Sequence, residues 1–195
     1  MKNRICKKAG LFLIFVFWAV LIYFNALRNP FHFDDVHHIQ NNPAIIGVEN
    51  IPSYFVDIRT FSIDHGNIGN YRPLLLMTHA LNYWAGDLDP LGYHLVNLAF
   101  HIGSAFLIFL IVQAMLTSAL IPLFPPLVKG DKGGLAGSSF AALAAGRIFL
   151  TTPFNSEVIN YISARSSVMS AFFYLLAFYC WINYRSQKSE VRSQK

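Results

Sequence analysis

Two adjacent carboxylates and a group of imidazoles stand close together in one short stretch of the chain, from Phe31 to Pro43. Asp34 and Asp35 are followed, after Val36, by His37 and His38. A carboxylate can act as a general base, and carboxylates together with imidazoles can ligate a metal ion. Two plainer interpretations stay open. The carboxylates could cap a helix or lie in a solvated turn, and the adjacent histidines, which point apart on a helix or strand, could lie on the surface.

The composition predicts a membrane protein. Of 195 residues, 54% are hydrophobic and 15% aromatic, whereas only 13% are charged. A soluble globular protein of average composition has about twice that share of charges. The formal net charge of +5 could suggest a nucleic-acid partner, but the basic residues form short clusters beside apolar runs. That placement is typical of a membrane topology signal, so we expect no nucleic-acid partner.

The first apolar run, 9–27, is long enough to cross a bilayer and follows a basic N-terminal segment, 1–8. A helix of this length covers roughly the ~30 Å hydrocarbon core. A cleaved signal peptide would share the basic start and the apolar run. However, Tyr23, Phe24 and Asn25 stand where a cleavage site of small residues should be. We therefore predict an uncleaved span.

Residues 28–94 are polar, acidic and aromatic, and we expect them to fold as a large outer loop that carries short amphipathic helices. The best helix candidate within it is 72–84, which has Pro73 in its first turn. One face of this helix would carry Leu74, Met77, Leu81 and Trp84. This face would lie either on the membrane surface or against the protein's own core.

Three more spans are predicted, and with the first they indicate an all-α membrane protein of about four transmembrane helices. They are 95–117, 138–154 and 166–184. The third run is the weakest, because Arg147 near its middle disfavours insertion by ~3 kcal/mol.

The segments between the spans predict the orientation. A Gly-rich loop, 118–137, follows the second span, an outer turn, 155–165, follows the third, and a disordered tail, 185–195, follows the fourth. The N-terminus, the Gly-rich loop and the tail hold ten of the fifteen basic residues. The positive-inside rule places these three segments in the cytoplasm. The opposite face is then the outer one, periplasmic if the membrane is a bacterial inner membrane, as we expect.

Four short blocks of sequence fall in or next to these outer segments. They are Asp34-Asp35 with Ile39 and Asn42-Pro43, then Tyr71-Arg72-Pro73-Leu74, then Asn82-Tyr83-Trp84 with Asp89-Pro90-Leu91-Gly92-Tyr93-His94 and His101, and last Pro153, Glu157 and Tyr161-Ile162-Ser163-Ala164-Arg165. In this order they resemble the GT-C class of membrane glycosyltransferases. The closest likeness is to the protein O-mannosyltransferase-like branch, in which a multispanning domain precedes tetratricopeptide repeats. The resemblance covers roughly 29–184, the N-terminal part of such a protein.

The resemblance implies transfer of a sugar from a polyprenyl-phosphate donor to a protein or glycan acceptor at the outer membrane face. A carboxylate of the first outer loop, Asp34 or Asp35, would lie at the reaction centre. We expect Asp35 to be the base, with Asp34 orienting it or holding a divalent metal. Arg72 or Arg165 would pair with the donor phosphate through the guanidinium fork.

Three further residues are candidate substrate contacts. His94 and His101 lie two turns apart on one predicted helical face, and hydrogen-bonded structural roles are equally open to them. Glu157 could contact substrate or pair with Arg165 in the outer turn.

Two classes of function remain open at this point. Where the family usually has His-Pro followed by a polar pair and Glu, this chain has Thr152-Pro153-Phe154-Asn155-Ser156-Glu157, so two histidines are absent. We expect the membrane part of a glycosyltransferase, either active within a longer protein or truncated and inactive. The alternative is a non-catalytic four-helix membrane protein that binds a partner or a lipid through its outer loop.

Overall fold

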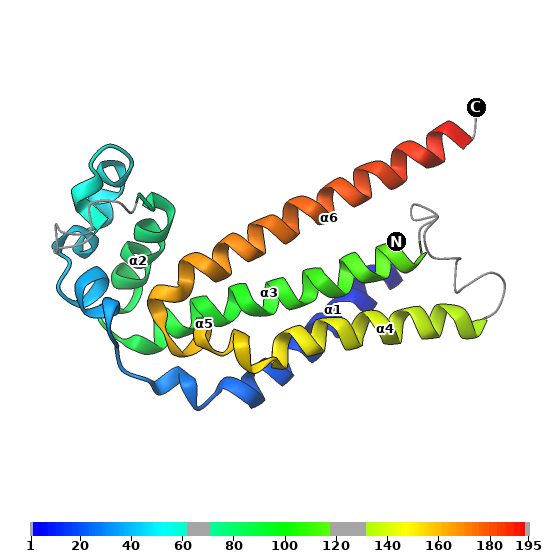
Figure 1. The fold of residues 1–195 in the computed structure, drawn as a ribbon, viewed down its shortest axis with the longest axis horizontal. Helices are drawn as coiled ribbons and strands as arrows, with labels where there is room; N and C mark the ends of the chain where they lie inside the picture. Colours follow the sequence, from blue (N-terminus) through cyan, green and yellow to red (C-terminus); the bar gives the residue numbers. More distant parts are fainter. Residues whose placement is uncertain (1, 62–70, 118–131, 194–195) are drawn as a thin grey trace. The chain divides into compact units, whose positions relative to one another are not determined.

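A computed structural model describes residues 2–61, 71–117 and 132–193, which form helices and turns without a strand (Figure 1). The prediction of an all-α fold is therefore confirmed. The chain divides into two compact units, which are taken separately below. Unit 1 comprises Met1–Val20, Phe100–Asn155 and Ser170–Lys195, and unit 2 comprises Leu21–Ala99 and Ser156–Met169.

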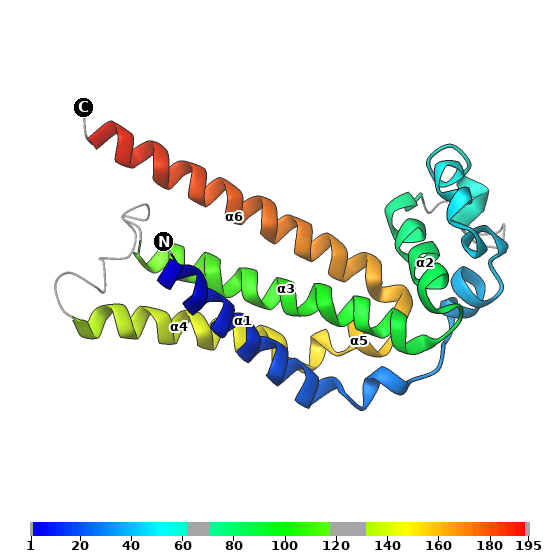
Figure 2. The ribbon, with the colours of Figure 1, turned by 180° about the vertical axis from the view of Figure 1, so that it is seen from behind.

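Unit 1 is built from long helices. They are α1 (Lys2–Tyr23), α3 (Pro90–Thr117), α4 (Lys132–Thr151) and α6 (Arg165–Ser193), with the short turn η7 (Pro153–Asn155) after α4. One end each of α1, α3 and α6 belongs to unit 2. Within this unit α1, α3 and α4 run side by side in both views (Figures 1 and 2). Aromatic rings make the contact between α1 and α3. The centre of the Phe15 ring of α1 lies 5.8 Å from that of Phe106 and 6.1 Å from that of Phe109, both in α3.

Two of the four predicted spans correspond to helices that are long and apolar enough to cross a membrane. They are Pro90–Thr117 and Ile162–Lys188, found among the described residues. The apolar part of α1, Ala9–Tyr23, is shorter. The four-helix count therefore remains a prediction.

The ends of the helices differ from the predicted limits. α3 begins at Pro90, before the predicted 95, because Asp89 accepts a hydrogen bond from the Leu91 N–H and proline suits a first turn. α4 begins at Lys132, within the segment predicted as the loop 118–137, and residues 118–131 lie outside the described part.

α6 continues to Ser193, through most of the segment 185–195 for which a disordered tail is predicted. The segment contains Arg, Gln, Lys and Glu and neither glycine nor proline, so nothing in its composition ends the helix. Residues 194–195 are not among those described.

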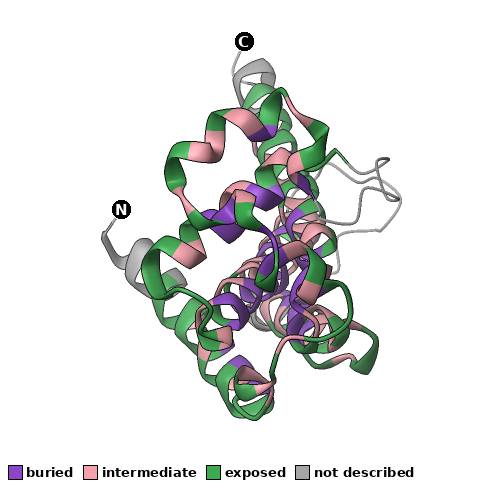
Figure 3. Ribbon diagram, turned by 90° about the vertical axis from the view of Figure 1, so that its left-hand side faces the viewer, coloured by how far each residue is buried: buried purple, intermediate pink, exposed green. Residues whose placement is uncertain are grey.

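Unit 2 consists mainly of short helical turns. They are η1 (Ala26–Arg28), η2 (Val36–Gln40), η3 (Pro43–Ile46), η4 (Val48–Phe55), η5 (Ile58–Phe61), α5 (Glu157–Asn160) and η8 (Ile162–Ala164), with one longer helix, α2 (Pro73–Gly86). Single buried residues alternate with exposed ones along these turns (Figure 3). α2 packs against η3 and η4. The small core of the unit includes Ile45, Tyr54, Leu75 and Leu76.

The buried side chain of Asn42 fixes the path of the turns that lead to α2. Its amide nitrogen donates to the carbonyl oxygens of His38, Thr60 and Phe61 at 3.1–3.3 Å. Its amide oxygen accepts from the Ala44 N–H at 3.0 Å. Turns without a regular ladder need such side-chain partners for their backbone groups.

The helix predicted for 72–84 is confirmed as α2, but its predicted apolar face is not the buried one. Leu74, Leu81 and Trp84 are exposed, Trp84 to 73%. The buried residues of α2 are Leu75, Leu76, His79 and Ala80. The alternative that the predicted face packs on the protein's own core is therefore wrong, and contact with the membrane surface stays a prediction.

Candidate functional site

Asp35 lies buried in unit 2, and both oxygens of its carboxylate are engaged. Oδ1 accepts hydrogen bonds from the backbone N–H of Ser163 at 2.7 Å and from the Ser163 hydroxyl at 2.5 Å. Oδ2 accepts from the backbone N–H of His32 at 3.1 Å. The residue is 1% exposed. Because a general base must come within ~3 Å of the proton it takes, this geometry suits a positioning role better than proton abstraction.

Asp34, in contrast, is exposed. The Tyr161 side chain lies near the Asp34 carboxylate. Burial, together with this neighbouring carboxylate, raises the pKa of Tyr161 to about 12. The phenol therefore stays protonated near pH 7. The Asp34 carboxylate is accessible to an incoming hydroxyl group.

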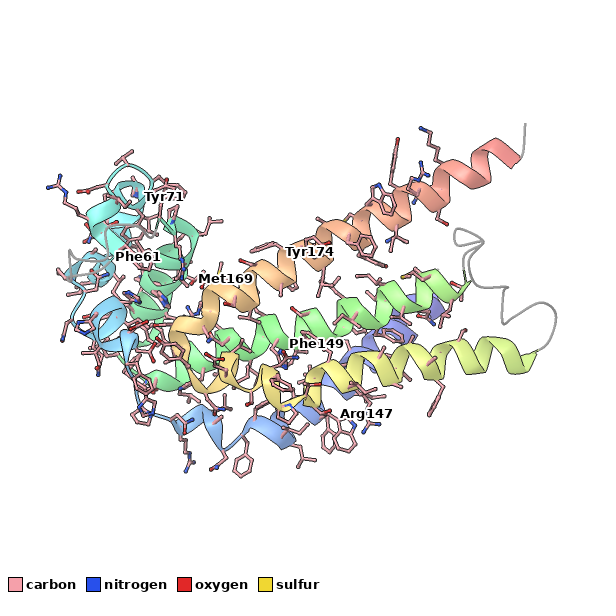
Figure 4. The ribbon with its side chains drawn as sticks, viewed as in Figure 1. Phe61, Tyr71, Arg147, Phe149, Met169 and Tyr174 are labelled. Atoms are coloured by element: carbon pink, nitrogen blue, oxygen red, sulfur yellow. The ribbon has the colours of Figure 1, made fainter. Side chains whose placement is uncertain are left out.

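Arg72 and His38 both lie beside the ring of Phe61 in unit 2. The exposed Arg72 donates from Nη1 to the Ser166 hydroxyl at 3.1 Å and lies 5.8 Å from the centre of the Phe61 ring, which is labelled in Figure 4. The His38 ring lies 4.6 Å from the same ring. Burial lowers the pKa of His38, while the charges of Asp34 and Arg72 shift it in opposite directions. His38 is thus neutral near pH 7, and the opposite charges of Asp34 and Arg72 both act on it.

Arg165 is fully buried in unit 2 and held by neutral oxygens. Nε donates to Asn97 Oδ1 at 2.7 Å, and Nη2 donates to the carbonyl oxygen of Tyr93 at 2.8 Å. Nη1 donates to Asn82 Oδ1 at 2.7 Å and to the Thr78 hydroxyl at 3.1 Å. Four of the five N–H donors of the guanidinium are thereby used within the protein. The geometry favours a structural role over contact with a phosphate.

The other predicted contacts are divided between the two units. In unit 2, the buried His94 has Nδ1 at 2.7 Å from the carbonyl oxygen of Ile159 and Nε2 at 3.0 Å from that of Asn29. In unit 1, the buried His101 has Nε2 at 3.2 Å from the carbonyl oxygen of Leu150. Both rings bind backbone oxygens, which favours the structural alternative for each.

Glu157 is exposed at the start of α5, whereas Arg165 has no exposed surface. The alternative that these two residues form an ion pair is wrong, since the ion pair found in the described part of the chain is that of Arg59 with Asp57. A substrate role for Glu157 stays a prediction.

A metal site at Asp35, His37 and His38 was one of the interpretations that the sequence left open, beside surface histidines. Across the described ranges, no group of three or more His, Cys, Asp or Glu side chains stands close enough to hold a metal ion. The physical reason is that the Asp35 oxygens are already taken by Ser163 and His32.

Sequence reasoning assigned no role to His79, Tyr161 or Ser163. Tyr161 and Ser163 belong to the same sequence block as Arg165, and this position could have indicated a role in the site. No sequence pattern indicated a role for His79. It is 1% exposed, neither ring nitrogen has a hydrogen-bond partner, and its ring lies 6.0 Å from that of Tyr93. Burial, aided by the charge of Arg165, lowers the pKa of His79 well below its ordinary value, so the ring is neutral.

Comparison with known proteins finds similarity to protein O-mannosyl-transferases. The chain is 30% identical over 162 residues to Protein O-mannosyl-transferase Tmtc1 of Drosophila melanogaster, and 32% identical over 174 residues to Protein O-mannosyl-transferase tmtc2 of Xenopus laevis. These matches cover 82% and 87% of the chain. The chain is a relative of the protein O-mannosyl-transferases. A third such protein, human TMTC4, is 27% identical over 181 residues, or 90% of the chain.

The match to these O-mannosyl-transferases covers only part of each relative. The chain spans 16% of Tmtc1, 18% of tmtc2 and 23% of TMTC4. No family model and no solved structure matches the chain. Its similarity to protein O-mannosyl-transferases agrees with the resemblance to that branch found in the four sequence blocks.

Proposed function

We propose that this chain is the membrane part of a glycosyltransferase that moves a sugar from a polyprenyl-phosphate donor to a protein acceptor at the outer face of the membrane. By the name of its relatives, the sugar is mannose. The observation that carries the proposal is the exposed Asp34 carboxylate in the same unit as the exposed Arg72 guanidinium, both acting on His38. An inverting transfer needs one group of each kind.

In this proposal Asp34 is the general base, and Asp35 holds it in place. Asp34 takes the proton of the acceptor hydroxyl as that oxygen bonds to the sugar C1. The bond between C1 and the phosphate oxygen breaks, and the lipid phosphate leaves with its negative charge. Arg72 stabilises that charge through its guanidinium fork. Asp35, closed in by Ser163 and His32, fixes the turn on which Asp34 stands.

We further propose four spans, with both ends of the chain in the cytoplasm, so that unit 2 faces outward. The weakest span, α4, carries Arg147, whose guanidinium lies 4.3 Å from the centre of the Trp18 ring. Arg147 stands about one turn from the end of α4 at Thr151. A long arginine side chain at that depth can extend to the headgroups, which lowers the cost of inserting α4.

The test is transfer of radiolabelled sugar from a polyprenyl-phosphate donor to an acceptor peptide, in membranes that carry the protein. We expect Asp34→Asn to lower the rate by about a hundredfold or more, because a general base contributes 10²–10⁴-fold, and to leave the unfolding midpoint unchanged. Asp35→Asn should lower both the rate and the midpoint.

The control is Glu49→Gln, which neutralises another exposed carboxylate of unit 2 and should change neither quantity. Full activity of Asp34→Asn would overturn the base assignment. Failure of the unmodified protein to transfer sugar from any polyprenyl-phosphate donor would overturn the proposed function.

A further inference from the structure

Phe33 has two unfavourable features at once. Its φ of +50° lies in the left-handed region, which side chains with a β-carbon rarely adopt, and its side chain is 84% exposed. Among the non-glycine residues described, Asp87 is the other one with a positive φ. The strain at Phe33 is not offset by burial of the ring. Backbone strain that persists without local compensation is frequent at binding and catalytic sites.

The place of Phe33 explains what its ring can reach. It precedes Asp34, and its ring meets the Tyr161 ring edge to face, at 6.2 Å between centroids and 86° between planes. Tyr161 is also the residue whose pKa is raised by the neighbouring Asp34 carboxylate, after burial. Phe33, Asp34 and Tyr161 therefore form one cluster, in which an exposed aromatic ring stands beside a carboxylate.

This cluster has the chemistry that recognises a pyranose ring. One face of a hexopyranose presents polarised C–H groups, which are attracted to the electron-rich face of an aromatic ring. The hydroxyls at the rim of the sugar are hydrogen-bond donors for a carboxylate. We propose that Phe33 is a binding residue for a substrate hexopyranose, which stacks on its ring next to Asp34. The proposal rests on the proposed function, in which Asp34 is the base.

The same ring exposed on a membrane protein could instead contact lipid. Two observations favour the sugar. The adjacent Asp34 carboxylate is exposed, and a charged group is costly in the hydrocarbon region. An anchor in the interface also needs no backbone in the left-handed region, because any exposed helix position presents a ring equally well.

The experiment compares four variants. Phe33→Ala and Phe33→Gly remove the ring, and glycine also relieves the positive φ. Phe33→Tyr keeps the ring. Asp87→Gly is the matched control, since it relieves a positive φ at another exposed residue of unit 2. The readouts are KM and kcat for sugar transfer, the unfolding midpoint, and saturation-transfer NMR with methyl α-D-mannopyranoside as the probe.

We expect Phe33→Ala and Phe33→Gly to raise KM by about tenfold and to lose the NMR signals of the sugar C–H groups, as for loss of one ring-stacking contact. Phe33→Gly should nevertheless unfold at a higher temperature than Phe33→Ala. Phe33→Tyr and Asp87→Gly should bind and transfer like the unmodified protein. A rise in KM for the donor identifies the donor sugar as the ligand, whereas a rise only for a glycosylated acceptor identifies the acceptor sugar.

Other outcomes overturn the proposal. If Phe33→Gly binds and transfers sugar normally, Phe33 is not a sugar contact, and the proposed function still stands. A Phe33→Trp variant can be placed in vesicles of brominated phosphatidylcholine. If the lipid quenches its tryptophan fluorescence, and the fluorescence does not change when the sugar is added, the ring contacts the bilayer. If the unmodified protein transfers no sugar, the proposed function fails. The NMR signals of the sugar with Phe33→Gly then decide whether Phe33 binds the sugar.

Discussion

Two arginines, one in each compact unit, show how differently the units are stabilised. Arg165 in unit 2 has no exposed surface and gives four hydrogen bonds to neutral oxygens. Arg147 in unit 1 is exposed, and its described partner is the face of the Trp18 ring (Figure 4). Unit 2 is thus held by polar side chains that join distant segments, and unit 1 by rings and close helix packing. The stability of unit 2 should therefore be sensitive to the loss of hydrogen bonds, and that of unit 1 to changes in side-chain volume.

The largest expected effect comes from removing the two arginines in turn. Arg165→Met should lower the free energy of unfolding by about 3–5 kcal/mol, because the side-chain oxygen of the buried Asn97 then loses its donor. Arg147→Met should cost at most about 1 kcal/mol, the scale of an exposed cation–π contact. Denaturant titration in detergent micelles measures both. Equal losses in the two variants would contradict the contrast between the units.

A smaller effect should follow from adding one methyl group to unit 1. A β-carbon at Gly146 would come within 2.8 Å of both the Ala105 carbonyl oxygen and the Phe15 ring, so Gly146→Ala should destabilise by about 1–3 kcal/mol. The control is Gly137→Ala on the same helix, which has nothing within 4 Å and should stabilise by up to about 1 kcal/mol. If Gly146→Ala is as stable as Gly137→Ala, helices α3 and α4 do not pack this closely.

The smallest effect concerns His79 and depends on pH. Because the pKa of His79 is lowered in the folded protein, the unfolded chain binds a proton below about pH 6.5 that the folded one does not. Stability should therefore fall as the pH drops below about 6.5, by up to ~1.4 kcal/mol per pH unit from this residue. His79→Leu should remove that part of the slope and be at least as stable at pH 7.5, since it buries no unpartnered nitrogen.

Unfolding free energies at pH 7.5, 6.5 and 5.5 measure the effect. His37→Leu, at an exposed histidine of the same unit, serves as the control. A slope that is unchanged in His79→Leu would show that another group carries the pH dependence.

The helices could be predicted from the sequence, but the division of roles within the site could not. Apolar runs and Pro73 sufficed to locate the helices that became α2 and α3, since periodicity and proline placement are local properties. Which of Asp34 and Asp35 is buried depends on Ser163, far along the chain, and no local pattern reports such a partner. The same holds for Arg165, whose acceptors include Asn82, also distant in the chain.

The bond between Asp35 and Ser163 also has a consequence for biosynthesis. The two residues are 128 positions apart, so at ~5–20 residues per second the ribosome needs roughly ten seconds to make the second after the first. In the proposed topology, the first outer segment would until then have crossed the membrane without the Ser163 donors of Asp35. It would reach its final conformation only when the turn before the last span has also arrived outside. Folding of the first loop around Asp35 would thus depend on correct insertion of the spans that lie between Asp35 and Ser163.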